Sequence, residues 1–268
     1  MKKLLAILLT AASLAAWLAV TPSKGLPEAA AQTTSCLPLF HEKTPPALTR
    51  PSLQASTVGL CYEAFAVMYS GVSRTPLWSA EHLTRDSLER AKAVKREDSF
   101  HAEEALPDSY RAQLSDYARS GFDRGHMSPA ADMPTKLAQH ESFSLANIVP
   151  QNRHNNQVLW SAIEGATRHL TNVRGELYVV TGPIFAGDKV ERLNGRVFIP
   201  THVFKAVLDP ATHEAAAWIA PNTDGDHYEI VSVAELEKRA KIDVFPKLSA
   251  NAKQTAMNLP SPRIRSRQ

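Results

Sequence analysis

Residues Gly121–Met133 read GFDRGHMSPAADM, and this stretch decides how the rest of the chain is interpreted. It places an acid, a permanent cation, a flexible joint and an imidazole at successive positions, Asp123, Arg124, Gly125 and His126. An imidazole can take a proton from water near neutral pH, and a guanidinium presents a planar fork of donors to phosphate oxygens. Glycine allows a tight turn or the close approach of a ligand, and the Asp123 carboxylate could orient a neighbouring donor. Taken alone, these residues are equally compatible with a solvated turn that carries a histidine by chance.

Further groups of residues, within this stretch and after it, belong to the same sequence signature. They comprise Met127, Pro129, Ala130 and Asp132, then Asn147–Gln151, then Asn156, Gln157, Trp160 and Glu164, and finally Tyr178–Pro183. With these groups, residues 78–248 resemble the DNA/RNA non-specific endonucleases, the ββα-metal nucleases of the Serratia nuclease and endonuclease G type. The resemblance implies an α+β fold with a central antiparallel sheet flanked by helices. It also implies a ββα-metal (His-Me finger) motif that carries His126 and Asn156.

The resemblance assigns the metal site to an asparagine. The matching asparagine of the family binds Mg²⁺, and Asn156 is in register with it. A hard divalent cation prefers oxygen ligands and keeps much of its water, so one amide oxygen can be its only protein ligand, with Mn²⁺ as an alternative ion. Asn155 is adjacent, but the spacing to Gln151 and to Glu164 favours Asn156. His126 then remains free to act as the general base.

A zinc site is an alternative metal reading. It would use His126, His140 and His154, which lie close together in the sequence. Their irregular spacing and the lack of a nearby cysteine disfavour it.

The pattern that follows Asn156 is helical, with apolar residues at Leu159, Trp160, Ile163, Ala166 and Leu170. On an ideal α-helix, Asn156 and Glu164 lie about 80° apart in azimuth and about 12 Å apart along the axis. We therefore expect Glu164, a catalytic candidate, to reach the ion through a metal-bound water. Arg168 is spaced to pair directly with Glu164, either as part of the site or as an ordinary surface ion pair. Arg124 and Arg168 are the expected contacts to nucleic acid.

A basic run over Leu83–Arg96 is compatible with a solvated helix face. The resemblance instead singles out Arg96, because family members have an active-site arginine just ahead of a phenylalanine, here Phe100. Glu103 stands where the family usually has an aspartate. Arg96 is therefore the expected catalytic arginine.

The N-terminus has the pattern of a secretory signal peptide. Basic residues precede an apolar run over Leu4–Val20, and small residues at Ala29–Ala31 predict cleavage after Ala31. An uncleaved membrane anchor is the alternative, because the run is nearly long enough to span a bilayer. We expect a periplasmic or secreted protein without stable membrane association after cleavage.

The rest of the chain divides into three parts. Residues 32–75 form an expected N-terminal arm, residues 76–248 the endonuclease domain, and residues 249–268 a loosely held basic tail. Pro76–Leu83 is expected to be a loop that enters a short element.

The two cysteines, Cys36 and Cys61, predict one disulfide in an exported protein, with two free buried thiols as the alternative. The disulfide would attach the arm to Leu60–Tyr69, which is apolar enough for a buried first strand.

Strands and a capped helix are expected after the central helix. The strand candidates are Leu177–Thr181, Arg196–Ile199, His202–Leu208 and Glu214–Ile219. Turn residues Asp209–Thr212 predict a hairpin between the last two. Ser232–Glu235 fits a capping box that opens a last helix, which ends near Ala240.

The charge balance limits how the chain could hold nucleic acid. It carries 30 Lys and Arg against 27 Asp and Glu, a formal net charge of +3. Removing residues 1–31 takes away three lysines and one glutamate and lowers the net charge to +1. This argues against a general polycationic surface. Phosphate binding must therefore come from a local cluster of arginines and a metal ion.

The sequence thus predicts an exported Mg²⁺-dependent endonuclease that acts on DNA and RNA. The resemblance implies 5′-phosphate products. A catalytically silent nucleic-acid-binding protein of the same fold and an enzyme acting on another phosphodiester are the alternatives. Oligomeric state and any inhibitor protein have no signature in the sequence.

Overall fold

The computed structural model describes residues 34–187 and 189–264. The predicted signal peptide at residues 1–31 lies outside this part of the chain. Within the described ranges, none of the helices combines the length and the apolar character needed to cross a membrane.

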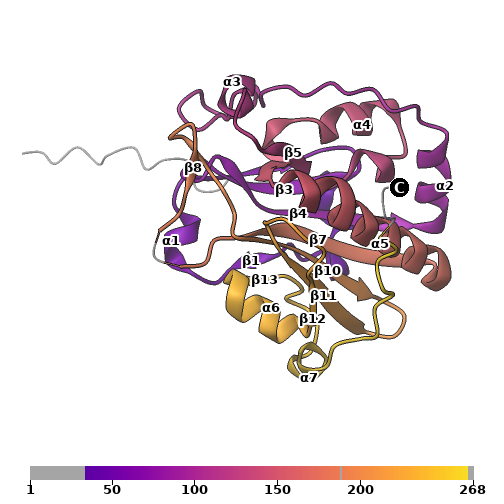
Figure 1. Ribbon diagram of the computed structural model, residues 1–268. Helices are drawn as coiled ribbons and strands as arrows, with labels where there is room; N and C mark the ends of the chain where they lie inside the picture. Colours follow the sequence, from indigo (N-terminus) through magenta and orange to yellow (C-terminus); the bar gives the residue numbers. More distant parts are fainter. Residues whose placement is uncertain (1–33, 188, 265–268) are drawn as a thin grey trace, which may run out of the picture.

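A seven-stranded sheet forms the centre of the protein (Figure 1). Its strand order is β12-β11-β10-β7-β4-β3-β2, and each neighbouring pair is antiparallel. The strands are β2 (Thr57–Cys61), β3 (Phe65–Ser70), β4 (Thr75–Thr84), β7 (Glu176–Ile184), β10 (His202–Asp209), β11 (Glu214–Pro221) and β12 (Glu229–Val231). The predicted α+β fold with a central antiparallel sheet is confirmed.

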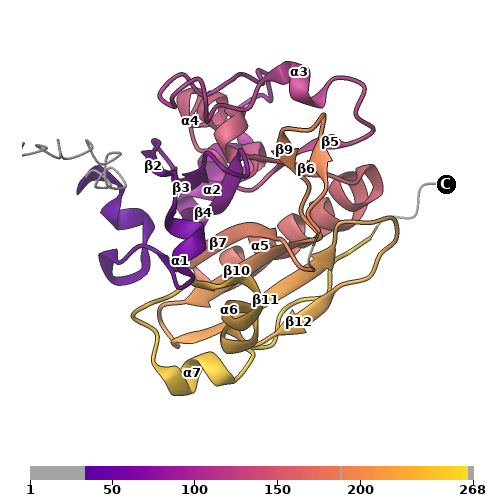
Figure 2. The ribbon, with the colours of Figure 1, turned by 90° about the vertical axis from the view of Figure 1, so that its left-hand side faces the viewer.

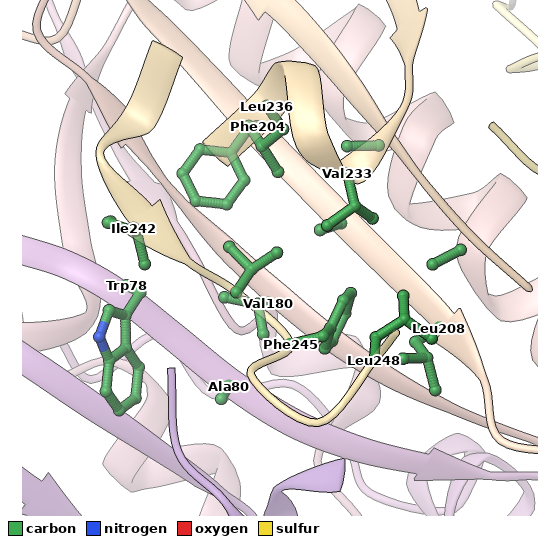
Figure 3. Close-up of a cluster of buried hydrophobic side chains, with 14 of the residues drawn as sticks. Trp78, Ala80, Val180, Phe204, Leu208, Val233, Leu236, Ile242, Phe245 and Leu248 are labelled. Atoms are coloured by element: carbon green, nitrogen blue, oxygen red, sulfur yellow. The ribbon is translucent and has the colours of Figure 1, made fainter. Parts of the chain in front are cut away.

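One face of the sheet is covered by helix α6 (Val233–Ala240). Because successive side chains of a strand point to opposite faces, alternate residues of β10 reach this helix. Phe204 and Leu208 of β10 belong to the same buried cluster as Val233 and Leu236 of α6 (Figure 3). The cluster is apolar and fixes α6 against the sheet.

The opposite face is covered by helix α5 (Ser161–Arg174). Here the other residues of β10, Val203 and Val207, share a cluster with Ile163 and Leu170 of the helix. The start of α5 is thereby held at one end of the sheet, where the sequence motif lies.

Smaller elements surround these layers. The helices are α1 (Pro51–Gln54), α2 (Arg85–Lys92), α3 (Leu114–Tyr117), α4 (Lys136–Ser142) and α7 (Ala250–Gln254). Short 3₁₀ turns are η1 (Thr34–Leu39), η2 (His41–Lys43), η3 (Ala130–Asp132) and η4 (Leu145–Asn147), and η5 (Asn155–Trp160) is a π-helical turn. Three two-stranded pairs join β1 (Ala47–Leu48) to β13 (Ile242–Asp243), β5 (Asp123–His126) to β6 (Ile148–Gln151), and β8 (Arg192–Leu193) to β9 (Val197–Phe198).

Several local predictions are confirmed. Strands β10 and β11 form the hairpin predicted from Asp209–Thr212. The Ser232 side chain accepts a hydrogen bond from the backbone N–H of Glu235 and caps α6, which ends at Ala240 as expected. Cys36 and Cys61 form a disulfide with their Cα atoms 5.8 Å apart, so the free-thiol alternative is wrong.

The prediction of one strand over Leu60–Tyr69 is wrong. The backbone N–H of Tyr62 donates to the carbonyl of Phe65 at 3.0 Å, and this turn separates β2 from β3. An apolar run hides such a turn, because residues that close it need not be glycine or proline. Both strands fall within residues 32–75 and belong to the central sheet.

The prediction of a loop over Pro76–Leu83 is also wrong. These residues lie in β4, which pairs with both β3 and β7 in the middle of the sheet. Proline and a charged residue are both uncommon inside a central strand. Pro76 sits near the start of the strand beside a register shift between Met68 and Tyr69, and Glu81 is buried within reach of Lys205.

The C-terminal segment is more firmly held than predicted. After α7, Met257 and Leu259 are buried in the cluster on the α5 face. The backbone N–H of Met257 donates to the carbonyl of Ala215 at 3.0 Å. The expectation of a loosely held tail is therefore wrong as far as Leu259.

Candidate active site

The motif residues form strand β5, which pairs antiparallel with β6 away from α6 and α7 (Figure 2). Gly125 of β5 lies opposite Val149, and a Cβ atom on Gly125 would meet Oε1 of Gln151 at 1.9 Å. Only glycine leaves room for the Gln151 side chain. Gln151 in turn donates from Nε2 to Oδ1 of Asn155, so the strand pair is tied directly to the start of the following helix.

The helix begins with the π-helical turn η5, which continues directly into α5. A π-helical turn contains about one residue more than an α-helical turn. The step from Asn156 to Glu164 therefore covers about the same rotation as seven residues of an ideal α-helix, which is close to two full turns. The ideal α-helical geometry expected from the sequence does not hold, and the two side chains come onto nearly the same face. Asn155 is buried and donates from Nδ2 to the carbonyl of Pro221, a structural role that separates it from Asn156.

A cavity of about 620 Å³ opens between β5, the π turn and the loop that precedes α3. It brings together most of the residues singled out in the sequence, namely Arg96, Asp123, Arg124, His126, Asn156 and Glu164. Strand β5, the continuous helix made by the π turn and α5, and the loop before Phe100 supply these groups from three separate parts of the chain.

Arg168 lies outside that cavity. It donates from Nη1 to Oδ1 of Asp132 at 2.8 Å, and Asp132 is almost fully buried. The predicted direct pair between Glu164 and Arg168 is therefore wrong. The helical spacing allows that pair, but the turn η3 places a buried carboxylate closer to the guanidinium.

His126 is buried in surroundings that favour the neutral form of its ring. Its ring packs against Phe100 and Phe143, at centroid distances of 5.3 and 4.8 Å. Its Nε2 atom is buried without a hydrogen-bond partner among the described residues. Burial, with the positive charges of Arg96 and Arg124, lowers the pKa of His126 to about 3, although Asp98 acts in the opposite direction. An imidazole in this state can accept a proton but does not carry one at neutral pH.

The two arginines of the cavity are held over aromatic rings. The Arg124 guanidinium carbon lies 4.2 Å from the centroid of Phe100, and that of Arg96 lies 5.2 Å from the centroid of Phe143. Arg96 also donates from Nε to Oδ1 of Asp98 at 2.8 Å, and its side chain is 57% exposed. Stacking orients each guanidinium while leaving donors free for an incoming phosphate.

Asp123 orients the amide of Asn156. Its Oδ2 accepts a hydrogen bond from Asn156 Nδ2 at 3.0 Å and from Gln157 Nε2 at 2.8 Å. With its nitrogen engaged, Asn156 offers Oδ1 as an acceptor. Asn156 Oδ1 and the Glu164 carboxylate are hard oxygen donors that line this cavity, whereas Asp123 is engaged by the two amide groups, and this donor set fits a Mg²⁺ or Mn²⁺ ion with a largely retained water shell.

The zinc alternative has no support in the described residues. They contain no group of three or more His, Cys, Asp or Glu side chains arranged to hold a metal. His154 bonds to Asp226, and His140 bonds to Ser99, so neither faces His126.

Sequence reasoning missed a set of buried charges beneath the cavity. Lys205 and Glu81 are each 1% exposed and lie 3.9 Å apart. Lys205 donates from Nζ to Thr181 Oγ1 at 2.7 Å and to the carbonyl of Met127, the residue after His126, at 3.4 Å. Burial raises the pKa of Glu164 to about 7, with Arg168 and then Lys205 opposing the rise. The available signal was a charged residue in the interior of each of two mostly buried strands.

Comparison with known proteins agrees with this geometry. The family model for DNA/RNA non-specific endonuclease matches residues 45–251. Nuclease C1 of Cunninghamella echinulata var. echinulata is 35% identical over 214 residues, which cover 70% of this chain and 83% of that protein. The mitochondrial nuclease EXOG of Danio rerio is 35% identical over 208 residues, covering 70% of this chain and 60% of that protein.

A solved structure is similar as well. The crystal structure of the EndoG/EndoGI complex, which concerns the mechanism of EndoG inhibition, aligns with this chain with a TM-score of 0.64 at 26% sequence identity. The alignment covers 74% of this chain and 89% of that chain. The chain therefore belongs to the DNA/RNA non-specific endonuclease family, whose members are metal-dependent phosphodiester hydrolases.

Proposed function

We propose that this protein is an exported, Mg²⁺-dependent endonuclease that cleaves DNA and RNA without strong sequence specificity and leaves 5′-phosphates. The observation that carries the proposal is the convergence of His126, Asn156, Glu164 and two stacked arginines in one cavity. A neutral base, oxygen donors for a cation and donors for phosphate are the groups that phosphodiester hydrolysis requires.

His126 is the general base of the proposed reaction. Its low pKa keeps the ring unprotonated at neutral pH, and the residue lines the catalytic cavity, so the imidazole can take a proton from a water that attacks phosphorus. Phe100 and Phe143 fix the ring orientation, so the accepting atom is held in place before substrate binds.

Asn156 and Glu164 are the residues that would hold the metal, Asn156 directly and Glu164 through a bound water. When bound, Mg²⁺ or Mn²⁺ would offset negative charge on the phosphate and on the leaving oxygen. Asp123 keeps the Asn156 amide oxygen available by occupying its nitrogen.

Arg96 and Arg124 would grip the phosphate oxygens. Contacts of this kind position a nucleic acid without reading its bases, which supports low sequence specificity and activity on both DNA and RNA. Arg168 would act through Asp132 rather than on the substrate, since its Nη1 is bonded there.

Export rests on residues 1–31 and is supported by the disulfide, which is typical of oxidising compartments. Several relatives are named as mitochondrial nucleases, including that of Saccharomyces cerevisiae, so the cellular location of this chain is tested separately. Mass spectrometry of the protein from its source cells should give an N-terminus at Gln32. An intact Met1 terminus in the membrane fraction would favour the anchor.

The central test is a cleavage assay with a matched pair of asparagine variants. Residues 32–268 should cut supercoiled plasmid and a structured RNA in Mg²⁺, stop in EDTA, and give ends that ligate without added kinase. Asn156→Ala should lose most of this activity, whereas Asn251→Ala on the exposed surface of α7 should keep it. Cleavage that persists in EDTA would reject the metal requirement. Near-normal activity of Asn156→Ala at saturating Mg²⁺ would reject its role as ligand.

A further inference from the structure

A second hollow, of about 700 Å³, lies against the outer surface of α5. Its helix side includes Gln157, Ser161, Gly165 and His169, and its other wall is the C-terminal segment with Pro260 and Arg263. We call this hollow the tail groove. Figure 1 shows the yellow C-terminal segment running from α7 up alongside α5.

The tail groove adjoins the catalytic cavity. Gln157 and Ser161 line both. From Gln157 to His169 the helix rises about 18 Å, which matches roughly five nucleotide steps of a stacked strand. A strand whose phosphate sits in the catalytic cavity would therefore reach the groove directly.

The wall that carries Arg263 is anchored on both sides. Leu259 is buried before it, and Ile264 packs against the apolar cluster under α5 after it. Arg263 is thus held on a fixed rim rather than on a free end of chain.

The lining of the groove suits a polyanion. Arg263 and His169 supply basic groups, and none of the described residues that line the groove is acidic. Arg263 also takes part in none of the ion pairs found within residues 34–187 and 189–264. A guanidinium in this position can bind phosphate oxygens without first leaving a carboxylate.

Gly165 is otherwise unexplained. Glycine within a helix is unfavourable relative to alanine, and it usually marks a turn or a close approach. A Cβ atom on Gly165 would meet nothing within 4 Å, so the folded chain itself does not require glycine there. Gly165 lines the groove, so a side chain there would take up space that a bound strand needs.

We propose that the tail groove binds the sugar–phosphate backbone of the substrate strand on one side of the phosphate that is cut, with Arg263 contacting a phosphate. The proposal rests on the nuclease function proposed above. It makes the C-terminal segment part of the substrate-binding surface.

The test compares long and short single-stranded DNA in EDTA, where binding is measured without cleavage. Fluorescence anisotropy of labelled 4-mer and 20-mer oligonucleotides would be recorded over a range of KCl. Arg263→Glu should weaken 20-mer binding about tenfold and lower the salt slope by about one unit, with a much smaller effect on the 4-mer. Arg50→Glu, an exposed charge beside α1, is the control and should change neither.

A steric variant gives an independent arm. Gly165→Leu should melt at the same or a higher temperature, because leucine favours helix and meets no neighbour, yet it should weaken 20-mer binding selectively. Unchanged 20-mer affinity in both variants would overturn the proposal. So would an equal loss for both lengths, which would move Arg263 to the catalytic cavity.

The two proposals fail in different ways. If the wild-type protein binds the 20-mer in EDTA but cuts nothing in Mg²⁺, the proposed nuclease function is rejected. The anisotropy measurements on the Arg263 and Gly165 variants then still test the groove proposal. If the wild-type protein does not bind the 20-mer, the groove proposal is rejected.

Discussion

The two faces of the central sheet are built from the same strands but differ in chemistry. The α6 face collects apolar side chains such as Ala80, Val180 and Phe204 (Figure 3). The next residues along the same strands reach the α5 face, and there Glu81 and Lys205 are buried. One face supplies stability, and the other carries charge beneath the catalytic cavity.

The charged face costs stability that the apolar face does not. Burying ions is unfavourable unless they are well paired, and neither carboxylate oxygen of Glu81 has a hydrogen-bond partner among the described residues. Burial, together with Asp132, raises the pKa of Glu81 well above its usual range. Lys205 nevertheless holds the carbonyl of Met127, next to the proposed base. We infer that this face is retained for the geometry of the site.

The largest expected effect separates chemistry from folding on the α5 face. His126→Ala should lower kcat by about 10²–10⁴-fold, because general-base catalysis typically contributes that much. Some stability should also be lost, because removing a buried ring that packs against Phe100 and Phe143 leaves a cavity, so turnover is measured well below the melting temperature. The measurements are steady-state turnover and Mg²⁺ affinity by titration calorimetry, with the exposed His227→Ala as control. Parallel loss of metal binding would make His126 a ligand or a structural residue.

The next effect concerns the buried pair itself. Lys205→Met should lower the free energy of unfolding by about 3 kcal/mol, the low end for breaking a buried pair, because Glu81 can take up a proton. Urea unfolding would measure this. The double variant Glu81→Leu/Lys205→Met should recover most of the stability but not kcat. Full activity in the double variant would show that the pair does not position the site.

Sequence reasoning succeeded where the signal is local. The turn at Asp209–Thr212 and the cap at Ser232 are short patterns with one favoured structure, and both were found. His126 was selected as an imidazole within the motif and Asn156 through the family resemblance, and both line one cavity.

It failed where distant residues decide the outcome. Glu81 lies in a central strand that was predicted as a loop, and its partner Lys205 lies far along the chain. The local spacing rule assigned Arg168 to Glu164, but tertiary packing of η3 supplied Asp132 instead. The π turn has no residue signature that distinguishes it from an ordinary start of a helix.

A cavity created on the apolar α6 face should lower stability without lowering kcat, in contrast to the changes at Glu81 and Lys205. Leu236→Ala should destabilise the protein by about 2 kcal/mol, the low end for leucine, because α6 is short and external and can settle toward the sheet. Its kcat below the melting temperature should equal that of the wild type, since the α6 face does not touch the catalytic cavity. Thermal unfolding and turnover at a low temperature check both parts. A fall in kcat comparable to that in the double variant would show that the two faces are coupled.

The smallest expected effect is a pH dependence on the α5 face. His126 has a pKa of about 3 in the folded protein, below the usual value of 6.5. Below pH 6.5 the unfolded chain therefore binds a proton that the folded protein does not bind. The neutral ring therefore favours the folded state above pH 6.5, and this contribution is lost as the pH falls toward 3. Between pH 6.5 and 5.5 the wild type should lose about 1 kcal/mol more stability than His126→Ala. Other carboxylates and histidines titrate in both proteins and cancel in the difference, and His227→Ala should follow the wild type. Urea unfolding at the two pH values measures the effect. If the curves of the wild type and His126→Ala run parallel, the folded protein protonates His126 as easily as the unfolded chain does, and the ring is not the sequestered base that the α5 face is proposed to hold.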